Sequence, residues 1–410
     1  MKRLDAIEIP GVLEPKIANS DVVRSCVGLL ALGRTDFDDI ELYRHHGYFR
    51  RTLGIKRVPS CETLRQRLDA SKGRFDAVLK AASVAVLGKA TLTSVRTFKN
   101  EYMPLDVDVS AFDNTGSHKE GVGRTYKGTD GYAPTFAYIG NEGYMLNCEL
   151  RPGTQHCQNG TPEFLRETFG FVERLGLRVP VLLRMDSGND AVENIALCPV
   201  GVYYLIKRNL RRERGEEWLA VAKAQGAAMQ PRPGKTVYLG ECKRRVDLGN
   251  GRMEELRVVF EVTERTVLAN GQPLLFPEVE VETWWTNLDE TPATVIELYH
   301  GHGTSEQFHS ELKSDMGVER LPSGKFATNG TVLQAAMVGF NILRRIGQEL
   351  LALPKTLPEK VEAGRRRLRS VLQDIMYMGC RYVRTARRHI LNLGANSPWG
   401  RTFVLLYARL

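Results

Sequence analysis

The stretch between Met103 and Asp186 limits the possible folds more than any other part of the sequence. Its first half contains three short apolar or alternating runs broken by glycine and proline, which predict three successive β-strands. Its second half contains a helical pattern and then a continuous apolar run, typical of a strand buried on both faces. The expected order β-β-β-α-β indicates an α/β protein with a mixed sheet and flanking helices. The five segments are residues 103–112, 132–140, 143–153, 161–176 and 179–186.

Strand-like runs continue beyond this stretch, whereas helices are expected after them. Residues 201–290 contain further strand-like runs and few long helical periods, which predicts a β-rich insertion. Helix resumes at Pro292, and residues 331–351 form the most apolar helical segment. In the earlier helix, Thr161 is the expected N-cap and Pro162 the first helical residue.

The amino-terminal part of the chain is expected to be helical. Residues 21–33 and 74–90 have helical apolar spacing, and Ser60 is the expected cap of a short basic helix between them. Two interpretations of this part remain open, because periodicity alone does not separate them. It is either a small helical module that docks on DNA or a scaffold domain with a solvated basic helix.

Positive charge is concentrated at the carboxyl end. The whole chain has a net charge of +9, and residues 351–410 alone hold twelve Lys or Arg against three Asp or Glu. This excess indicates an anionic partner, although charge alone does not separate nucleic acid from a membrane surface. We expect arginine-rich helices here that bind DNA phosphates, with a solvated helix face as the alternative. The arginines proposed for this contact are Arg365, Arg366, Arg367, Arg387 and Arg388.

Other features of the composition indicate a soluble cytoplasmic protein. The sequence has no unbroken run of about 18 apolar residues that could cross a bilayer, so no membrane partner is expected. The amino terminus has no apolar segment behind its two basic residues and does not resemble a secretory signal. The seven cysteines are scattered and odd in number, which predicts free, mostly buried thiols rather than disulfides or a zinc module.

Carboxylates at strand ends and on a helix are the candidates for chemistry. Asp106 and Asp108 share one face of the first strand, because strand side chains alternate, and the sequence does not choose between them. Asp186 ends the buried strand, where open α/β sheets place ligand-binding groups, although a lone aspartate there is more often a turn or cap residue. Together with a helical carboxylate, such groups suit a pair of Mg²⁺ ions that act on a phosphodiester. One helix face would carry Tyr299, His302, Glu306, His309 or Ser310, and Lys313.

Histidines in the same helical segment raise the alternative of a zinc site. Zinc ligands must converge on one point, but His300 is turned about 160° from His302 by helical geometry. Gly301 and Gly303 loosen that turn further. We therefore interpret the segment as a catalytic helix, with its histidines as DNA-facing or cap groups.

Three motifs taken together resemble a known family. "DVS" supplies Asp108 two residues before a serine, and "RMDSG" supplies Asp186 after a buried strand. Tyr299, Glu306 and Lys313 have the spacing of a Tyr-Arg-Glu-Lys signature. The chain thus resembles the DDE transposases of bacterial insertion sequences, in the group with that signature and a ribonuclease-H-like core interrupted by a β-rich insertion. The phrases "GRTYKGTDGYAP" and "ELKSDMGVERLPS" also look like this family.

The resemblance assigns roles to these positions. It implies that Asp108, Asp186 and Glu306 form a metal-binding triad holding two Mg²⁺ ions, for which Mn²⁺ would substitute. Glu311 is a rival carboxylate, but it lies about 140° round the helix from Glu306. The family's functional residues beside the triad correspond to Tyr299, His302 and Lys313, which would face the DNA backbone.

His302 departs from the signature. The family has arginine at this position, and a neutral imidazole donates one hydrogen bond where a guanidinium offers a fork. The departure leaves the triad intact and puts the usual phosphate contact in doubt. The alternative is that His302 caps or packs against the turn at Gly301 and Gly303.

A pair of tryptophans in the predicted insertion is a further candidate. Related transposases use an aromatic residue of the insertion to hold a flipped base, and strand alternation should turn either Trp284 or Trp285 outwards. The alternative is that both indoles pack on opposite faces of a sheet.

The resemblance implies a cut-and-paste transposase that acts as a homodimer on double-stranded DNA, both the inverted ends of its element and the target. It would work in the bacterial cytoplasm, associated with the nucleoid, and its attack usually passes through a hairpin on the element end. The alternatives are a catalytically inactive, transposase-derived DNA-binding protein and a ribonuclease-H-like nuclease that does not join strands. The expected parts are a helical DNA-binding region (1–95), the first part of the core (96–200), the insertion (201–290), the catalytic helix (291–345) and a basic helical region (346–410).

Overall fold

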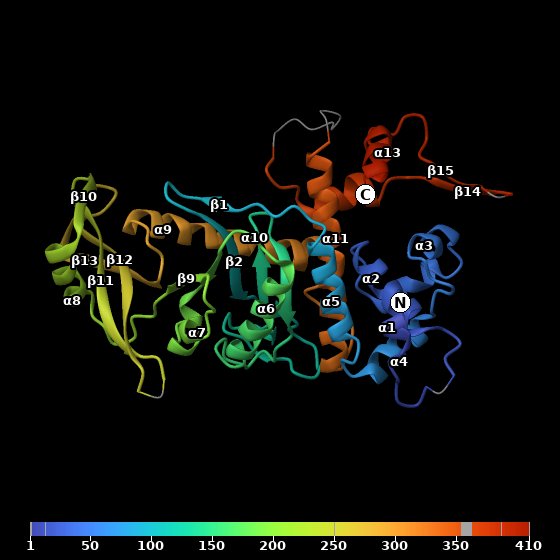
Figure 1. The fold of residues 1–410 in the computed structure, drawn as a ribbon, viewed down its shortest axis with the longest axis horizontal. Coiled ribbons are helices and arrows are strands. Elements are labelled where there is room, and N and C mark those ends of the chain that lie inside the picture. The colour runs from blue at the N-terminus through green and yellow to red at the C-terminus, as the bar shows by residue number, and fades with distance from the viewer. Residues whose placement is uncertain (1, 13, 250, 354–362, 387, 410) are drawn as a thin grey trace.

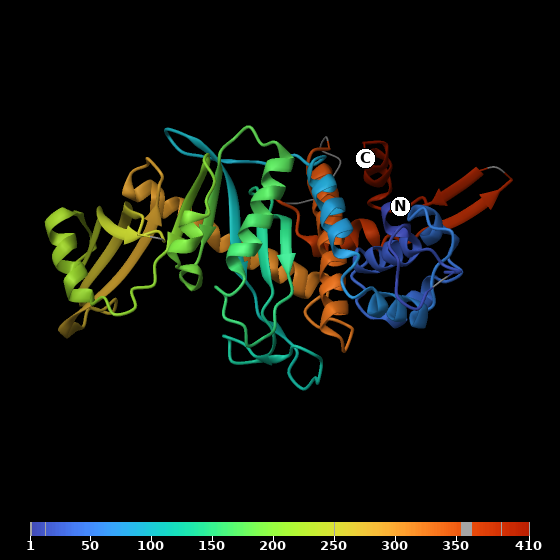
Figure 2. The same ribbon diagram turned by 60° about the horizontal axis from the view of Figure 1, so that its bottom comes forward.

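The computed structural model of the protein describes residues 2–12, 14–249, 251–353, 363–386 and 388–409. Its architecture is mixed α/β, with a ten-stranded sheet and flanking helices. The strands follow the order β10-β11-β12-β13-β9-β8-β2-β6-β7, and β1 pairs with the start of β2. Strands β10–β13 lie at one end of the elongated molecule, and the amino-terminal helices lie at the other (Figure 1; Figure 2).

The elements have the following bounds. The strands are β1 Val95–Arg96, β2 Glu101–Val109, β3 Phe112–Asp113, β4 Gly123–Arg124, β5 Asp130–Tyr132, β6 Thr135–Ile139, β7 Tyr144–Glu149, β8 Val181–Met185, β9 Val202–Lys207, β10 Ala227–Arg232, β11 Lys235–Asp247, β12 Met253–Val267, β13 Pro273–Thr286, β14 Arg381–Thr385 and β15 Arg388–Asn392. The α-helices are α1 Lys2–Asp5, α2 Asn19–Leu30, α3 Gly47–Thr52, α4 Cys61–Ser71, α5 Asp76–Leu87, α6 Thr161–Leu175, α7 Val192–Ala196, α8 Gly215–Gln225, α9 Pro292–His300, α10 Ser305–Ser310, α11 Phe326–Leu351, α12 Leu368–Val371 and α13 Gly400–Arg409. Short 3-10 turns are η1 Phe37–Tyr43, η2 Ser187–Asn189 and η3 Gly301–Thr304, and π-helical turns are η4 Glu311–Asp315 and η5 Leu372–Met376.

The centre of the sheet has the predicted order of strands and helix. Strand β2 pairs antiparallel with β6, which pairs antiparallel with β7. After helix α6 the chain returns as β8, which lies parallel to β2, and β9 lies parallel to β8. All five residues of β8 are buried, as its continuous apolar pattern predicts. The predicted β-β-β-α-β order is therefore confirmed.

The start of α6 differs from the prediction. Its N-cap is Gly160, with a φ of 78°, a left-handed value that favours glycine. Thr161 is the first helical residue, and its hydroxyl donates to the carbonyl oxygen of Cys157 at 2.6 Å. The predicted Thr161 cap is thus wrong by one position, because glycine makes the turn into the helix. Ser60, in contrast, caps α4 as predicted and accepts a hydrogen bond from the Thr63 amide.

The β-rich segment is continuous with the central sheet. Long antiparallel strands β11, β12 and β13 confirm the predicted strand runs, and β13 pairs antiparallel with β9. Helix α8, which the sequence analysis did not predict, packs its buried Trp218 against Phe260 of β12. The predicted insertion, residues 201–290, therefore includes one strand, β9, that pairs directly with the centre of the sheet.

Helix α11 joins the amino-terminal helices to the sheet. Apolar side chains of α2, α4 and α5 share one hydrophobic cluster with α11 and with the β6–β7 hairpin. Asn341 of α11 accepts a hydrogen bond from the Met145 amide and donates to Ser83 of α5. Among the described residues, no helix has both the length and the apolar character needed to cross a membrane.

The carboxyl-terminal region is only partly helical. The predicted helix at residues 384–389 is wrong, because β14 and β15 form an antiparallel hairpin there. β-branched and aromatic residues favour strands, and several of them pair across this hairpin. Tyr382 lies opposite Leu391, and Val383 lies opposite Ile390. In the figures it extends away from the rest of the molecule (Figure 1; Figure 2).

All seven cysteines lie within the described residues and are free thiols, as predicted. The expectation that most are buried is only partly right. The buried cysteines are Cys26, Cys61 and Cys148, and the half-buried ones are Cys157, Cys198 and Cys242. Cys380 is exposed.

Candidate active site

Two neighbouring parallel strands bring Asp108 and Asp186 together. Val107 of β2 is in register with Met185 of β8, so the residue that follows each of them lies at the same level of the sheet. Both carboxylates face one cavity of about 660 Å³. This is the end of parallel strands at which α/β sheets form their ligand sites.

The opposite wall of the cavity is a nearly continuous helical segment made of α9, η3, α10 and η4. Thr291 caps its start by accepting a hydrogen bond from the Thr294 amide. The polar face predicted from helical spacing does line the cavity, together with the two aspartates. Its residues are Tyr299, His302, Glu306, His309, Ser310 and Lys313.

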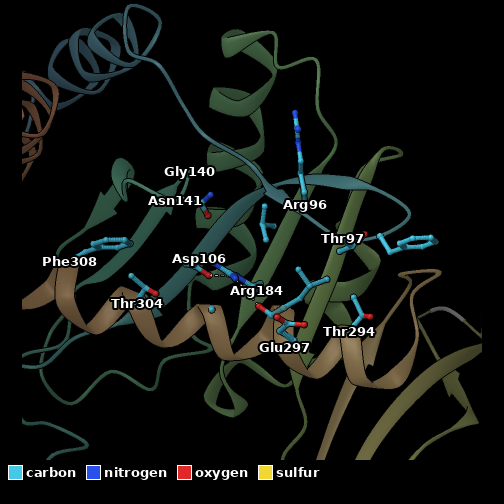
Figure 3. Close-up of a pocket in the computed structure, with 14 residues that line it drawn as sticks. Arg96, Thr97, Asp106, Gly140, Asn141, Arg184, Thr294, Glu297, Thr304 and Phe308 are labelled. Carbon is cyan, nitrogen blue, oxygen red and sulfur yellow. Dashed lines mark hydrogen bonds and ion pairs between the residues drawn. The ribbon is translucent and has the colours of Figure 1, made fainter. Parts of the chain in front are cut away.

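Asp106 is held in an ion pair away from this cavity. It is 2% exposed, and Arg184, its partner in register on β8, donates from Nε and Nη2 to both carboxylate oxygens at 2.7 Å (Figure 3). Asp106 and Arg184 line a separate cavity of about 550 Å³. Burial acts to raise the pKa of Asp106, but Arg184 and His302 lower it overall. Arg184 was missed in the sequence, although an arginine within an otherwise apolar buried strand is a visible signal for a buried partner.

His302 joins the Asp106 ion pair. Its side chain is buried, and its Nδ1 lies 2.8 Å from Asp106 Oδ1. Burial lowers the pKa of His302, yet the Asp106 carboxylate raises it overall. The phosphate contact of His302 stays a prediction, since the ring lines the cavity while Asp106 occupies its Nδ1. The Asp106 carboxylate binds two side chains from different elements, Arg184 of β8 and His302 of η3.

His309 binds Asp108 and is itself held by a tyrosine. His309 Nε2 lies 3.2 Å from Asp108 Oδ2, and Tyr138 Oη of β6 lies 3.2 Å from His309 Nδ1. Burial raises the pKa of Tyr138 well above its usual value, so its hydroxyl stays protonated. In the tautomer with its proton on Nε2, His309 donates to Asp108 and accepts from this hydroxyl at Nδ1. Tyr138 was missed because the sequence does not give the pairing of β6 with β2.

The charges of Asp108 and Asp186 interact. Burial acts to raise the pKa of Asp108, and the hydrogen bond and charge of His309 lower it overall. The pKa of Asp186 is raised, first by burial and then by the nearby charge of Asp108, against a 2.9 Å hydrogen bond from Asn189. Two carboxylates that repel each other at the edge of a polar cavity are a suitable environment for a cation.

Glu306 is exposed on the helix side of the cavity. Among the described residues it has no hydrogen bond or ion pair, so its carboxylate is free to bind a ligand. The cavity thus offers oxygen donors of the kind that Mg²⁺ prefers. No three His, Cys, Asp or Glu side chains in the described part of the chain are grouped closely enough to hold an ion together.

Glu311 points away from the cavity. It is 1% exposed, forms ion pairs with Arg344, at 3.0 Å, and with Arg365, and accepts a hydrogen bond from the Leu368 amide. The other signature residues stay at the cavity, where Lys313 donates to the Ala111 carbonyl oxygen at 2.7 Å. The structure thus separates the two helical glutamates.

Neither tryptophan of the insertion faces outwards. Trp284 is 0% and Trp285 is 6% exposed, so the expectation that one of them presents its ring to a base is wrong. Trp284 packs against Tyr299 with 5.6 Å between ring centroids, and Trp285 donates to Asp190 at 2.9 Å. The two rings pack on opposite faces because β13 is covered on both sides at this end.

The first arginine run binds carboxylates of the protein itself. Arg365 pairs with Glu311, and Arg367 pairs with Asp315 at 2.8 Å. Arg366 is buried and pairs with Asp374. These three guanidinium groups are not a free phosphate-binding surface, contrary to the prediction. In the second run, Arg388 is exposed on β15, and Arg387 lies outside the described residues.

Comparisons with known proteins found one family and a solved structure that the chain is similar to. The family described as Transposase DDE domain group 1 matches residues 16–410. A solved structure, the cryo-EM structure of the piggyBac transposase synaptic complex with hairpin DNA, has a TM-score of 0.39 and 12% sequence identity, covering 87% of this chain and 70% of that chain. A TM-score this low does not establish a shared fold. No curated protein matches the chain.

Proposed function

This chain belongs to the family Transposase DDE domain group 1, and on that premise we propose that it cuts DNA at the inverted ends of a bacterial insertion sequence and joins the freed 3′ ends to target DNA. The observation that carries the proposal is that Asp108, Asp186 and Glu306 all line one cavity. Two of these carboxylates lie at adjacent strand ends and the third lies on the facing helix. We propose this triad as the catalytic, metal-binding set.

The donor set supports Mg²⁺ as the cofactor, with two ions and with Mn²⁺ as a substitute. The ions would be held by Asp108, Asp186 and Glu306, because all three offer hard oxygen ligands. Of these three, only Glu306 has no hydrogen bond or ion pair with the described residues. The chemistry that a bound pair supplies is activation of the attacking oxygen and stabilisation of the leaving oxygen at phosphorus.

The protein's own residues have supporting roles around this triad. His309 holds Asp108 by the hydrogen bond described above, so the carboxylate keeps one orientation. Tyr299 and Lys313 line the same cavity, and we propose that they contact the DNA backbone next to the cleaved bond. Arg388, exposed on the hairpin, is proposed to bind a more distant phosphate.

We further propose that the centre of the sheet is a ribonuclease-H-like core. Support comes from the order β7-β6-β2-β8-β9, with three antiparallel strands followed by two parallel ones. Because β9 pairs with β8, we place the start of the insertion after Lys207 instead of at residue 201. Within this division the chain acts as a homodimer that holds both element ends.

Incubation of the protein with Mg²⁺, a labelled duplex and a target plasmid tests the proposal. The duplex carries the inverted repeat read from the DNA that flanks the gene. Labelled ends joined to the plasmid are the expected result. Cleavage without joining would indicate a nuclease, and a shifted but uncut duplex would indicate a DNA-binding protein. Asp186→Asn is the matched control and is expected to bind the duplex without cutting it.

A further inference from the structure

Tyr126 is an exposed aromatic residue at the edge of the candidate active site. It lies in the loop between β4 and β5, is 64% exposed, and lines the same cavity as Asp108 and Asp186. Of the large apolar side chains that the structure describes as exposed, it is the only one that lines this cavity. Because it borders a cavity, this exposed ring is placed where a nucleic-acid base could stack on it.

The ring is held in one position even though it is exposed. Its hydroxyl donates to the carbonyl oxygen of Val109, the residue that follows Asp108, at 3.0 Å. The loop is closed by hydrogen bonds from the Thr125 amide to Thr129 and from the Gly128 amide to Thr125, both at 2.9 Å. A ring that is fixed at its polar end and 64% exposed loses little conformational freedom when a flat ligand stacks on it.

The loop leads into a small three-stranded sheet. Strand β5 lies between β3 and β4, and a Cβ at Gly131 would meet the carbonyl oxygen of Phe112 at 1.8 Å. Only glycine permits this close approach of two backbones. The strand that follows the Tyr126 loop is therefore packed closely against β3.

Lys127 adds a positive charge beside the ring. Its ammonium nitrogen lies 5.8 Å from the centroid of the Tyr126 ring. Lys127 is exposed and has no ion pair with any residue that the structure describes. An aromatic face and an unpaired cation side by side match a nucleotide, since a base stacks on the first and a phosphate binds the second.

We propose that Tyr126 and Lys127 form a nucleotide subsite, in which an unpaired base next to the cleaved phosphodiester stacks on the tyrosine ring. Lys127 binds the adjoining phosphate. The subsite rests on the proposed function, because it places the base by reference to the bond that is cut. Stacking of this kind accepts any base, so the subsite positions the strand without reading its sequence.

Photocrosslinking tests the subsite directly. The probe is the element-end duplex in which 5-iodouracil replaces the base next to the cleavage position, irradiated with the protein in the absence of divalent metal. The crosslinked peptide is expected to contain Tyr126. Moving 5-iodouracil ten base pairs into the duplex should abolish this crosslink. A crosslink that maps to another residue overturns the proposal.

Affinity for the same duplex separates stacking from the hydroxyl anchor. Tyr126→Ala is expected to weaken binding by on the order of ten-fold, the effect of losing one stacked base. Tyr126→Phe keeps the ring and should bind within about two-fold of wild type, as should the control Tyr407→Ala, which removes an exposed tyrosine elsewhere. Equal affinity of Tyr126→Ala and Tyr407→Ala, or equal loss in Tyr126→Phe and Tyr126→Ala, overturns the subsite. Neither result touches the proposed function, which fails only if wild type does not cut and join the ends.

Discussion

Four carboxylates from strand β2 and from the helical segment that faces it fall into two groups. Asp108 and Glu306, with Asp186, line the cavity, and we call these three the open carboxylates. Asp106 and Glu311, which we call the paired carboxylates, are buried and bound to arginines. Each group includes one residue from the strand and one from the helix. The difference shows that an arginine partner, more than position on an element, decides which carboxylate is available for chemistry.

The largest expected difference between the groups concerns cleavage. Asp108→Asn, Asp186→Asn and Glu306→Gln should each make cleavage of a labelled end undetectable, because each removes an oxygen ligand of the proposed site. Binding of the same end should stay within a few fold, since its affinity comes mostly from Lys and Arg. Gel-based cleavage and mobility-shift assays on one set of samples measure both. Cleavage that persists in any of the three variants removes that residue from the triad.

Loss of a paired carboxylate should lower the stability of the fold more than loss of an open carboxylate does. Asp106→Ala leaves the buried Arg184 without a counter-charge and is expected to lower the free energy of unfolding by about 3–5 kcal/mol. The matched control Asp108→Ala should cost less than about 1 kcal/mol, because it also relieves repulsion with Asp186. Urea unfolding of the two variants gives the comparison. Equal losses would show that the two aspartates do not differ in the way described here.

A smaller effect is expected for the residues that hold Asp108. His309→Ala should raise the Mg²⁺ concentration for half-maximal cleavage by about 10–100-fold, as loss of a group that orients a metal ligand does. Tyr138→Phe keeps the ring and loses only the hydroxyl that orients His309, so its effect should be smaller. Ser314→Ala, at the same cavity, is the control. A Mg²⁺ requirement that does not change in His309→Ala would contradict the role of this hydrogen bond.

The smallest effect concerns pH. The folded pKa of His302 is raised above its unfolded value of about 6.5, so its protonated form stabilises the fold below that value. This contribution is lost as the pH rises through the folded pKa. The stability difference between wild type and His302→Gln should therefore be larger at pH 6 than at pH 9, as measured by urea unfolding. The exposed control His300→Gln should show no such trend.

Much of the fold and part of the site could be predicted from the sequence. The strand order around Asp186 and the polar helix face from Tyr299 to Lys313 follow from periodicity, which is a local property. The choice between Asp106 and Asp108 could not be predicted, because it depends on Arg184 in the neighbouring strand. Periodicity places both aspartates on one face and says nothing about which of them has a partner.

The errors have similar causes. Arg365 and Arg366 were assigned to DNA from a charged run and His302 from its place in the signature, and neither pattern carries information about buried counter-charges. Either Trp284 or Trp285 was expected to face outwards, but β13 is covered on both faces where it meets β9. In each case a contact between residues distant in the chain decided the outcome.

Mn²⁺ binding, followed by electron paramagnetic resonance, tests most directly the claim that the open carboxylates hold the metal. The sample is the full-length protein bound to an element-end duplex. The account predicts that wild type and Glu311→Gln bind Mn²⁺ with the same stoichiometry, whereas Asp186→Asn loses the bound ions. Unchanged Mn²⁺ binding in Asp186→Asn, or its loss in Glu311→Gln alone, would contradict the account.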